Sequence, residues 1–70
     1  MTSEQLQTLA SRALAYRDSL RLAGAPRNLP LEIGAVGLRE LCHARRWKRA
    51  RECASALLRA VPELQANPQS

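Results

Sequence analysis

The sequence predicts an all-α protein built from three antiparallel helices. Apolar residues recur at helical spacing in three separate segments, and each segment carries its own start and stop residues. Neither strand-like alternation of apolar and polar residues nor a hairpin turn signal is present. Because short links join the segments, neighbouring helices should run antiparallel. A chain of 70 residues forms one domain, which we place at residues 1–64, followed by a flexible tail at residues 65–70.

The first helix is predicted over residues 3–23. Thr2 and Gln5 have the spacing of a capping box, in which the side chain of each residue pairs with the backbone N–H of the other. Gly24 supplies a stop signal, and Pro26 follows just beyond it. One apolar stripe runs along this helix at spacings of three and four residues: Leu6, Leu9, Ala13, Tyr16 and Leu20.

The second helix is predicted over residues 29–44. Asn28 can cap it, and Pro30 is tolerated in its first turn, where no intrahelical donor is lost. Gly34 and Gly37 each cost about 1 kcal/mol relative to alanine inside a helix. We therefore expect another helix to approach closely on the glycine side; the alternative is a helix that frays at these two positions.

The third helix is predicted over residues 46–61 and has the clearest amphipathic pattern in the chain. Pro62 should either end this helix or open one further short turn through Leu64. The apolar arc of the helix contains Trp47, Ala50, Ala54, Leu57, Leu58 and Val61.

The second half of the chain carries a spaced pattern of aromatic, small and proline residues. Trp47 opens the third helix, Ala50 follows three residues later, and Pro62 lies fifteen residues after Trp47. In this spacing Leu31–Leu64 resembles one degenerate tetratricopeptide repeat, although its later large and small positions are inverted. The resemblance implies a helical hairpin that buries one face on a neighbouring unit. By architecture it is similar to the small helical chaperones and adaptors of bacterial export systems.

Charge and size both favour a binding partner. The formal net charge is +5, and ten of the eleven basic residues are arginine. This balance attracts nucleic acid, an acidic protein face or a membrane surface, although arginine enrichment equally fits a genome-wide composition bias. A chain this short buries only about 60% of its unfolded surface, so a partner chain would add stability. The N-terminus lacks the pattern of a signal peptide, which predicts a cytoplasmic protein.

The sequence has few residues suited to catalysis or metal binding. His43 is the only histidine, and Glu40 three residues earlier is the one group placed to orient it. No nucleophile accompanies them, so we predict that the protein is not an enzyme. Cys42, His43 and Cys53 lack the paired spacing of zinc ligands, and we predict no metal and no cofactor. The two thiols fit the role of small apolar side chains in the protein interior.

These observations favour a non-enzymatic protein–protein interaction module, such as a small chaperone, adaptor or accessory subunit. The partner is another protein chain, either a different protein or a second copy. Our hypothesis places it on the first apolar stripe or on the glycine side of the second helix, with two arginines at a polar rim. The predicted contact residues are Leu6, Leu9, Leu20, Gly34, Gly37, Arg49 and Arg51.

The alternative is a small basic protein that binds DNA or RNA. Its contact residues would be Arg45, Arg46, Lys48, Arg49 and Arg59. Long arginine side chains suit bidentate contacts to phosphate, but they also suit the rim of an apolar stripe. Glu52 lies in the middle of the exposed face of the third helix and would repel phosphate. The basic cluster is therefore either a contact surface for an anion or a border that keeps the protein soluble.

Overall fold

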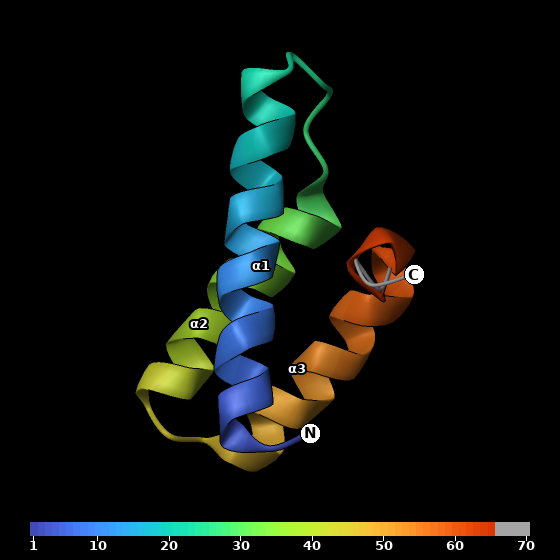
Figure 1. Cartoon of the computed structure of the whole chain (residues 1–70). Helices are drawn as coiled ribbons and strands as arrows, with labels where there is room; N and C mark the ends of the chain where they lie inside the picture. The colour runs from blue at the N-terminus through green and yellow to red at the C-terminus, as the bar shows by residue number, and fades with distance from the viewer. Residues whose placement is uncertain (66–70) are drawn as a thin grey trace.

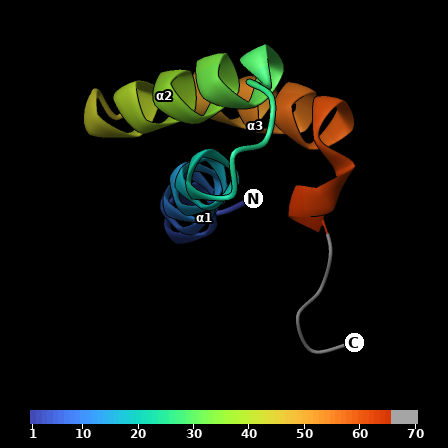
Figure 2. The ribbon, with the colours of Figure 1, turned by 90° about the horizontal axis from the view of Figure 1, so that it is seen from above.

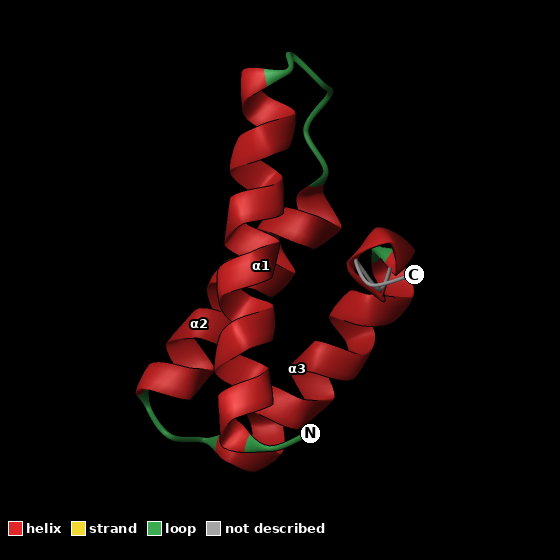
Figure 3. Cartoon of the chain, viewed as in Figure 1, coloured by secondary structure: helices red, strands yellow, loops and turns green. Residues whose placement is uncertain are grey.

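The structure, a computed structural model, describes residues 1–65 and confirms the all-α prediction (Figures 1 and 3). Its elements are α1 (Ser3–Leu22), α2 (Leu29–His43), α3 (Trp47–Ala60) and the short 3-10 helix η1 (Pro62–Gln65). Each end of the three α-helices lies within one residue of its predicted position. Figure 3 shows helices and loops alone over the described part of the chain.

The ends of α1 follow the local signals in the sequence. The N–H of Gln5 donates to Oγ1 of Thr2 at 3.1 Å, and the N–H of Thr2 donates to Oε1 of Gln5 at 2.9 Å, which completes the capping box. Gly24 ends the helix with a φ of 74°, in the left-handed region that glycine favours. Its N–H donates to the carbonyl of Arg21, and the N–H of Ala25 donates to the carbonyl of Leu20.

The ends of α2 also have a side-chain cap and a left-handed residue, but the left-handed residue is an arginine. Oδ1 of Asn28 accepts a hydrogen bond from the N–H of Leu31 at 3.1 Å, as predicted for a cap. At the other end Arg45 has a φ of 58°, so an arginine occupies the left-handed position that glycine usually takes at the end of a helix. The N–H groups of Arg45 and Arg46 donate to the carbonyls of Cys42 and Leu41. These hydrogen bonds close the turn although the left-handed conformation of Arg45 lowers the stability of the fold by about 1 kcal/mol.

The ends of α3 are less well satisfied. Arg46 stands at the cap position but makes no capping hydrogen bond with its side chain, and the first turn has no acidic residue. At the other end the helix stops before Pro62, which opens η1. This confirms the second of the two outcomes expected for Pro62, a further short turn that includes the buried Leu64.

The helices form two layers, and α2 packs against both α1 and α3. Seen from above in Figure 2, α2 and α3 lie side by side, and α1 crosses one face of this pair. η1 folds from the end of α3 toward the same side as α1 (Figure 2). The α2–α3 hairpin is therefore covered on one face by α1 and η1, and its opposite face has no covering element among the described residues.

The core lies between the two layers and is rich in alanine. Small side chains let the helices approach closely, because little volume separates their backbones. The side chain of Arg12 ties α1 to η1 beside this core, since its Nη2 donates to the backbone carbonyl of Leu64 at 2.7 Å. The buried residues are Leu6, Leu9, Ala10, Ala13, Leu31, Ala35, Leu38, Cys42, Ala50, Ala54, Leu57, Val61 and Leu64.

Two predictions about the ends of the chain need correction. Leu6 and Leu9 were expected on a surface that binds a partner, but both are buried because α1 packs its apolar stripe on the chain's own hairpin. The tail was expected from residue 65, but Gln65 closes η1, and its Nε2 donates to the carbonyl of Leu58 at 3.0 Å. The rest of the predicted tail, residues 66–70, lies outside the described residues.

Candidate functional site

An apolar groove runs between α2 and α3 on the uncovered face of the hairpin. Its volume is about 460 Å³. Two of its side chains project strongly into solvent: Ile33 is 71% exposed and Leu29 is 53% exposed. Large apolar side chains with this exposure on one continuous surface are typical of a binding site. The groove is lined by Leu29, Pro30, Ile33, Gly34, Gly37, Cys53, Ala56, Leu57 and Ala60.

The two glycines of α2 have different roles at the floor of this groove. A Cβ atom on Gly34 would lie 2.7 Å from Cδ1 of Leu57, so the helices could not approach this closely with any larger residue unless Leu57 moved. Sγ of Cys53 also contacts the carbonyl oxygen of Gly34 at 3.7 Å. A Cβ on Gly37 would meet only Sγ of Cys53 at 3.9 Å, an ordinary contact. The expected close approach is confirmed at Gly34, whereas Gly37 has room for a side chain.

The predicted polar rim is present on one side only. Arg49 precedes Cys53 by four residues, so it lies on the groove face of α3, one turn beyond the end of the groove. Arg51 follows two residues later and is rotated by about 200° around the helix, away from the groove. Leu20, which was grouped with Leu6 and Leu9, is half-buried at the edge of the core.

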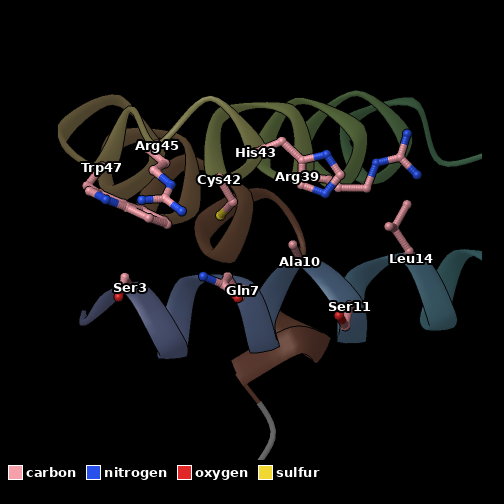
Figure 4. Close-up of a pocket in the computed structure, with 10 residues that line it drawn as sticks. All are labelled: Ser3, Gln7, Ala10, Ser11, Leu14, Arg39, Cys42, His43, Arg45 and Trp47. Carbon is pink, nitrogen blue, oxygen red and sulfur yellow. The ribbon is translucent and has the colours of Figure 1, made fainter.

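A second cleft lies between α1 and the C-terminal end of α2, and Figure 4 shows its lining residues. Its volume is about 690 Å³. Its basic lining residues are Arg39, His43 and Arg45, and no aspartate or glutamate lines it. Neutral polar side chains of α1 form the facing wall, and Trp47 stands beside Arg45 at one end (Figure 4). The other lining residues are Ser3, Gln7, Ala10, Ser11, Leu14 and Cys42.

The sequence alone did not reveal this second cleft. Its residues come from two distant segments, 3–14 and 39–47, so no local motif contains them all. The nearest local signal was the polar series Ser3, Gln7 and Ser11, whose spacing of four places them on one face of α1. Only the crossing of α1 over α2 brings this series opposite the basic residues (Figure 4).

The basic residues of the nucleic-acid alternative are all exposed, but they point in different directions. Arg45 lines the α1–α2 cleft, and Arg49 lies on the groove side of α3. Lys48 and Arg59 share a third face of α3 with Glu52 between them. Arg46 completes the set in the turn before α3. The chain therefore does not gather these cations into one continuous contact surface.

The two cysteines are a free buried thiol and a free half-buried thiol, and His43 lines the α1–α2 cleft. Both thiols are free, and burial raises the pKa of Cys42 and of Cys53, which lowers their fraction of reactive thiolate. Glu40, considered as a partner of His43, instead forms an ion pair with Arg39 at 3.4 Å. Within residues 1–65 no three histidine, cysteine or acidic side chains are grouped as metal ligands would be.

The ion pair of Arg27 and Glu32 has the shortest N–O distance among the described ion pairs. Nε of Arg27 donates to Oε2 of Glu32 at 3.0 Å, and Nη2 donates to Oε1 at 3.2 Å. This bidentate contact links the connection between α1 and α2 to the first turn of α2. The hydrogen bond from Arg27 lowers the pKa of Glu32 below its ordinary value.

Comparison with known proteins leaves the family open. No protein-family model matches the chain, and neither a curated protein nor a solved structure is similar enough to count as a match. The tetratricopeptide resemblance therefore rests on its residues alone. As to the membrane, none of the helices that the structure describes has the length and apolar character needed to cross a bilayer.

Proposed function

We propose that this chain is a non-enzymatic protein-interaction module that binds a helix of another protein in the groove between α2 and α3. The observation that carries the proposal is the exposure of Leu29 and Ile33 on a groove lined by apolar side chains and glycine. Exposing such side chains to water costs free energy that burial against a partner would recover, at about 25 cal/mol per Å² of apolar surface.

The shape of the groove suits a helix as the occupant. A third helix that lies along two packed helices buries its apolar stripe through residues spaced at i, i+3, i+4 and i+7. From Leu29 to Gly37 the wall formed by α2 is about 12 Å long, since each helical residue rises about 1.5 Å. The groove therefore matches about two turns of a partner helix. This arrangement also fits the repeat resemblance, in which a hairpin completes its packing on a neighbouring helix.

The charge of the chain favours an acidic partner over a second copy. Two copies, each with a formal net charge of +5, repel one another as they approach. Arg49 lies beyond the end of the groove, and Arg59 and Glu52 flank the outer edge of α3, which leaves a net positive border on this side. Acidic residues beside the apolar stripe of a partner helix would complement this border. A small chaperone, adaptor or accessory subunit would use such a surface.

A pair of designed peptides tests the proposal directly. Both carry the same two-turn leucine stripe, and the flanking residues are glutamate in one peptide and lysine in the other. We expect the glutamate peptide to bind more tightly, by isothermal titration calorimetry, because its flanks complement the basic border. Ile33→Glu should abolish this binding by placing a charge in the groove. Leu22→Glu is the matched control, because Leu22 is 89% exposed and lies outside the groove.

The outcomes separate the two functions inferred from the sequence. Equal effects of the two glutamate substitutions, or no binding of either peptide, would contradict helix binding in the groove. Binding of duplex or single-stranded DNA that survives Ile33→Glu and weakens steeply with salt would instead favour the nucleic-acid alternative, because phosphate contacts release counterions. Once the glutamate peptide is shown to bind, the natural partner can be identified as a protein that the wild-type chain recovers from lysate and that the Ile33→Glu variant does not.

A further inference from the structure

The α1–α2 cleft has the chemistry of an anion site, and it lies on a different side of α2 from the apolar groove. Its basic lining residues are Arg39, His43 and Arg45, and no aspartate or glutamate lines it. Arg39 is already paired with Glu40 at 3.4 Å, which leaves Arg45 as the arginine open to a ligand. The guanidinium of Arg45 forms no hydrogen bond or ion pair with any residue of the described part of the chain. Its donors are therefore available to a ligand, and the planar fork of arginine matches the oxygens of phosphate.

The rest of the cleft adds an aromatic surface and neutral polar groups. Trp47 is half-buried, and its indole lies beside the guanidinium of Arg45 at one end of the cleft (Figure 4). A flat aromatic side chain offers a stacking surface to a planar ring. Across the cleft, Gln7 and Ser11 of α1 can donate or accept hydrogen bonds at the edge of such a ring.

We propose that this cleft binds a phosphate monoester that carries a planar ring, the chemistry of a nucleoside monophosphate. Arg45 holds the phosphate, and Trp47, at the same end of the cleft, stacks on the ring (Figure 4). The volume of about 690 Å³ falls within the range of about 300–1,000 Å³ typical of small-molecule sites. A long polyanion would need basic residues that continue beyond the cleft, but the neighbouring cations of α3 point in other directions. The proposal does not depend on the function of the apolar groove.

The fluorescence of Trp47 reports directly on this site, because it is the only tryptophan in the chain. The protein is titrated separately with adenosine monophosphate, adenosine and inorganic phosphate, with excitation at the red edge of the indole absorption to avoid the adenine band. We expect a saturable change of emission with the monophosphate. Adenosine and phosphate should each bind at least about tenfold more weakly, because each supplies only half of the contacts.

Two substitutions and a matched control locate the ligand. Arg45→Gly removes the guanidinium from a position where the backbone already has the conformation that glycine favours, so the fold should be retained. Arg45→Gly should weaken binding by at least about tenfold, since it removes charged hydrogen bonds to the phosphate. Arg39→Gln should have a smaller effect, because Arg39 pairs with Glu40 and lies at the other end of the cleft. Lys48→Gln removes the same charge from an exposed position that does not line the cleft, and it should leave the affinity unchanged.

Each contrary result overturns a stated part of the proposal. Absence of a saturable response to the monophosphate excludes the site as proposed. Equal affinity for inorganic phosphate removes the role of the ring and of Trp47. If Lys48→Gln weakens binding as much as Arg45→Gly, the protein responds to net charge and not to the cleft. If a single-stranded oligonucleotide binds where the monophosphate does not, the ligand is a polynucleotide and the proposal is wrong.

Discussion

At position 45 an arginine adopts a backbone conformation that glycine adopts more readily, and this has a measurable cost. Its φ of 58° places Cβ close to the following carbonyl oxygen. We expect Arg45→Gly to raise the free energy of unfolding by about 1 kcal/mol, measured by urea denaturation. Arg45→Ala is the control, because it removes the same charge but keeps the Cβ atom. Equal stabilisation by both variants would attribute the gain to charge and not to the backbone.

The ion pair between Arg27 and Glu32 predicts a dependence of stability on pH. The pKa of Glu32 is lower in the folded protein than in the unfolded chain. The ionised carboxylate therefore stabilises the fold fully at pH values above the pKa that Glu32 has in the unfolded chain. This stabilisation is lost as the pH falls through the lower pKa of the folded state. We expect the thermal midpoint to fall less steeply with acid in Glu32→Gln than in the wild type. Arg27→Gln should flatten the same limb of the curve. High salt should reduce the difference, because the guanidinium of Arg27 is largely exposed to solvent.

The local signals in the sequence were read correctly because each acts within a few residues. The capping box at Thr2 and Gln5, the cap at Asn28 and the stop at Gly24 are complete within one helical turn. The left-handed conformation of Arg45 was not predicted, because no residue type at that position announces it. There the closure of the turn outweighs the intrinsic preference of arginine.

At the scale of the helices, the contact between α2 and α3 gives the two glycines of α2 opposite predictions. Gly37→Ala should raise the free energy of unfolding by about 0.5–1 kcal/mol, because alanine is the better helix former and the site has room. Gly34→Ala should be at least about 1 kcal/mol less stable than Gly37→Ala, because its new Cβ would displace the buried Leu57. Both values come from chemical denaturation under the same conditions.

Equal stabilisation by the two alanines would contradict the close approach of the helices at Gly34. The sequence correctly predicted that another helix approaches the glycine side of α2, because two glycines lower the stability of a helix and close packing can offset this loss. It could not show which glycine makes the contact. That depends on where Leu57 of α3 lies opposite α2, a relation that the spacing within either helix does not contain.

At the scale of the whole molecule, the sequence predicted the fold well and the binding surfaces only in part. Apolar periodicity identified the buried stripe of α1, but it could not say whether the chain or a partner covers that stripe. The prediction that Leu6 and Leu9 contact a partner was therefore wrong, because both are buried. The glycine side of α2 does border an exposed apolar groove. The α1–α2 cleft depends on how two helices cross, so local spacing gave no direct sign of it.

The hydrogen bond from Arg12 to the carbonyl of Leu64 has a consequence for the order of folding. It joins residues that are 52 positions apart, whereas α1 with α2 and α2 with α3 are neighbours in the chain. Neighbouring helices need only short loops to close, so such proteins fold within about microseconds to milliseconds. Closing the longer loop between η1 and α1 costs more chain entropy, so we expect this contact to form after both helix pairs. We likewise expect it to open early in unfolding, which amide hydrogen exchange at η1 would report.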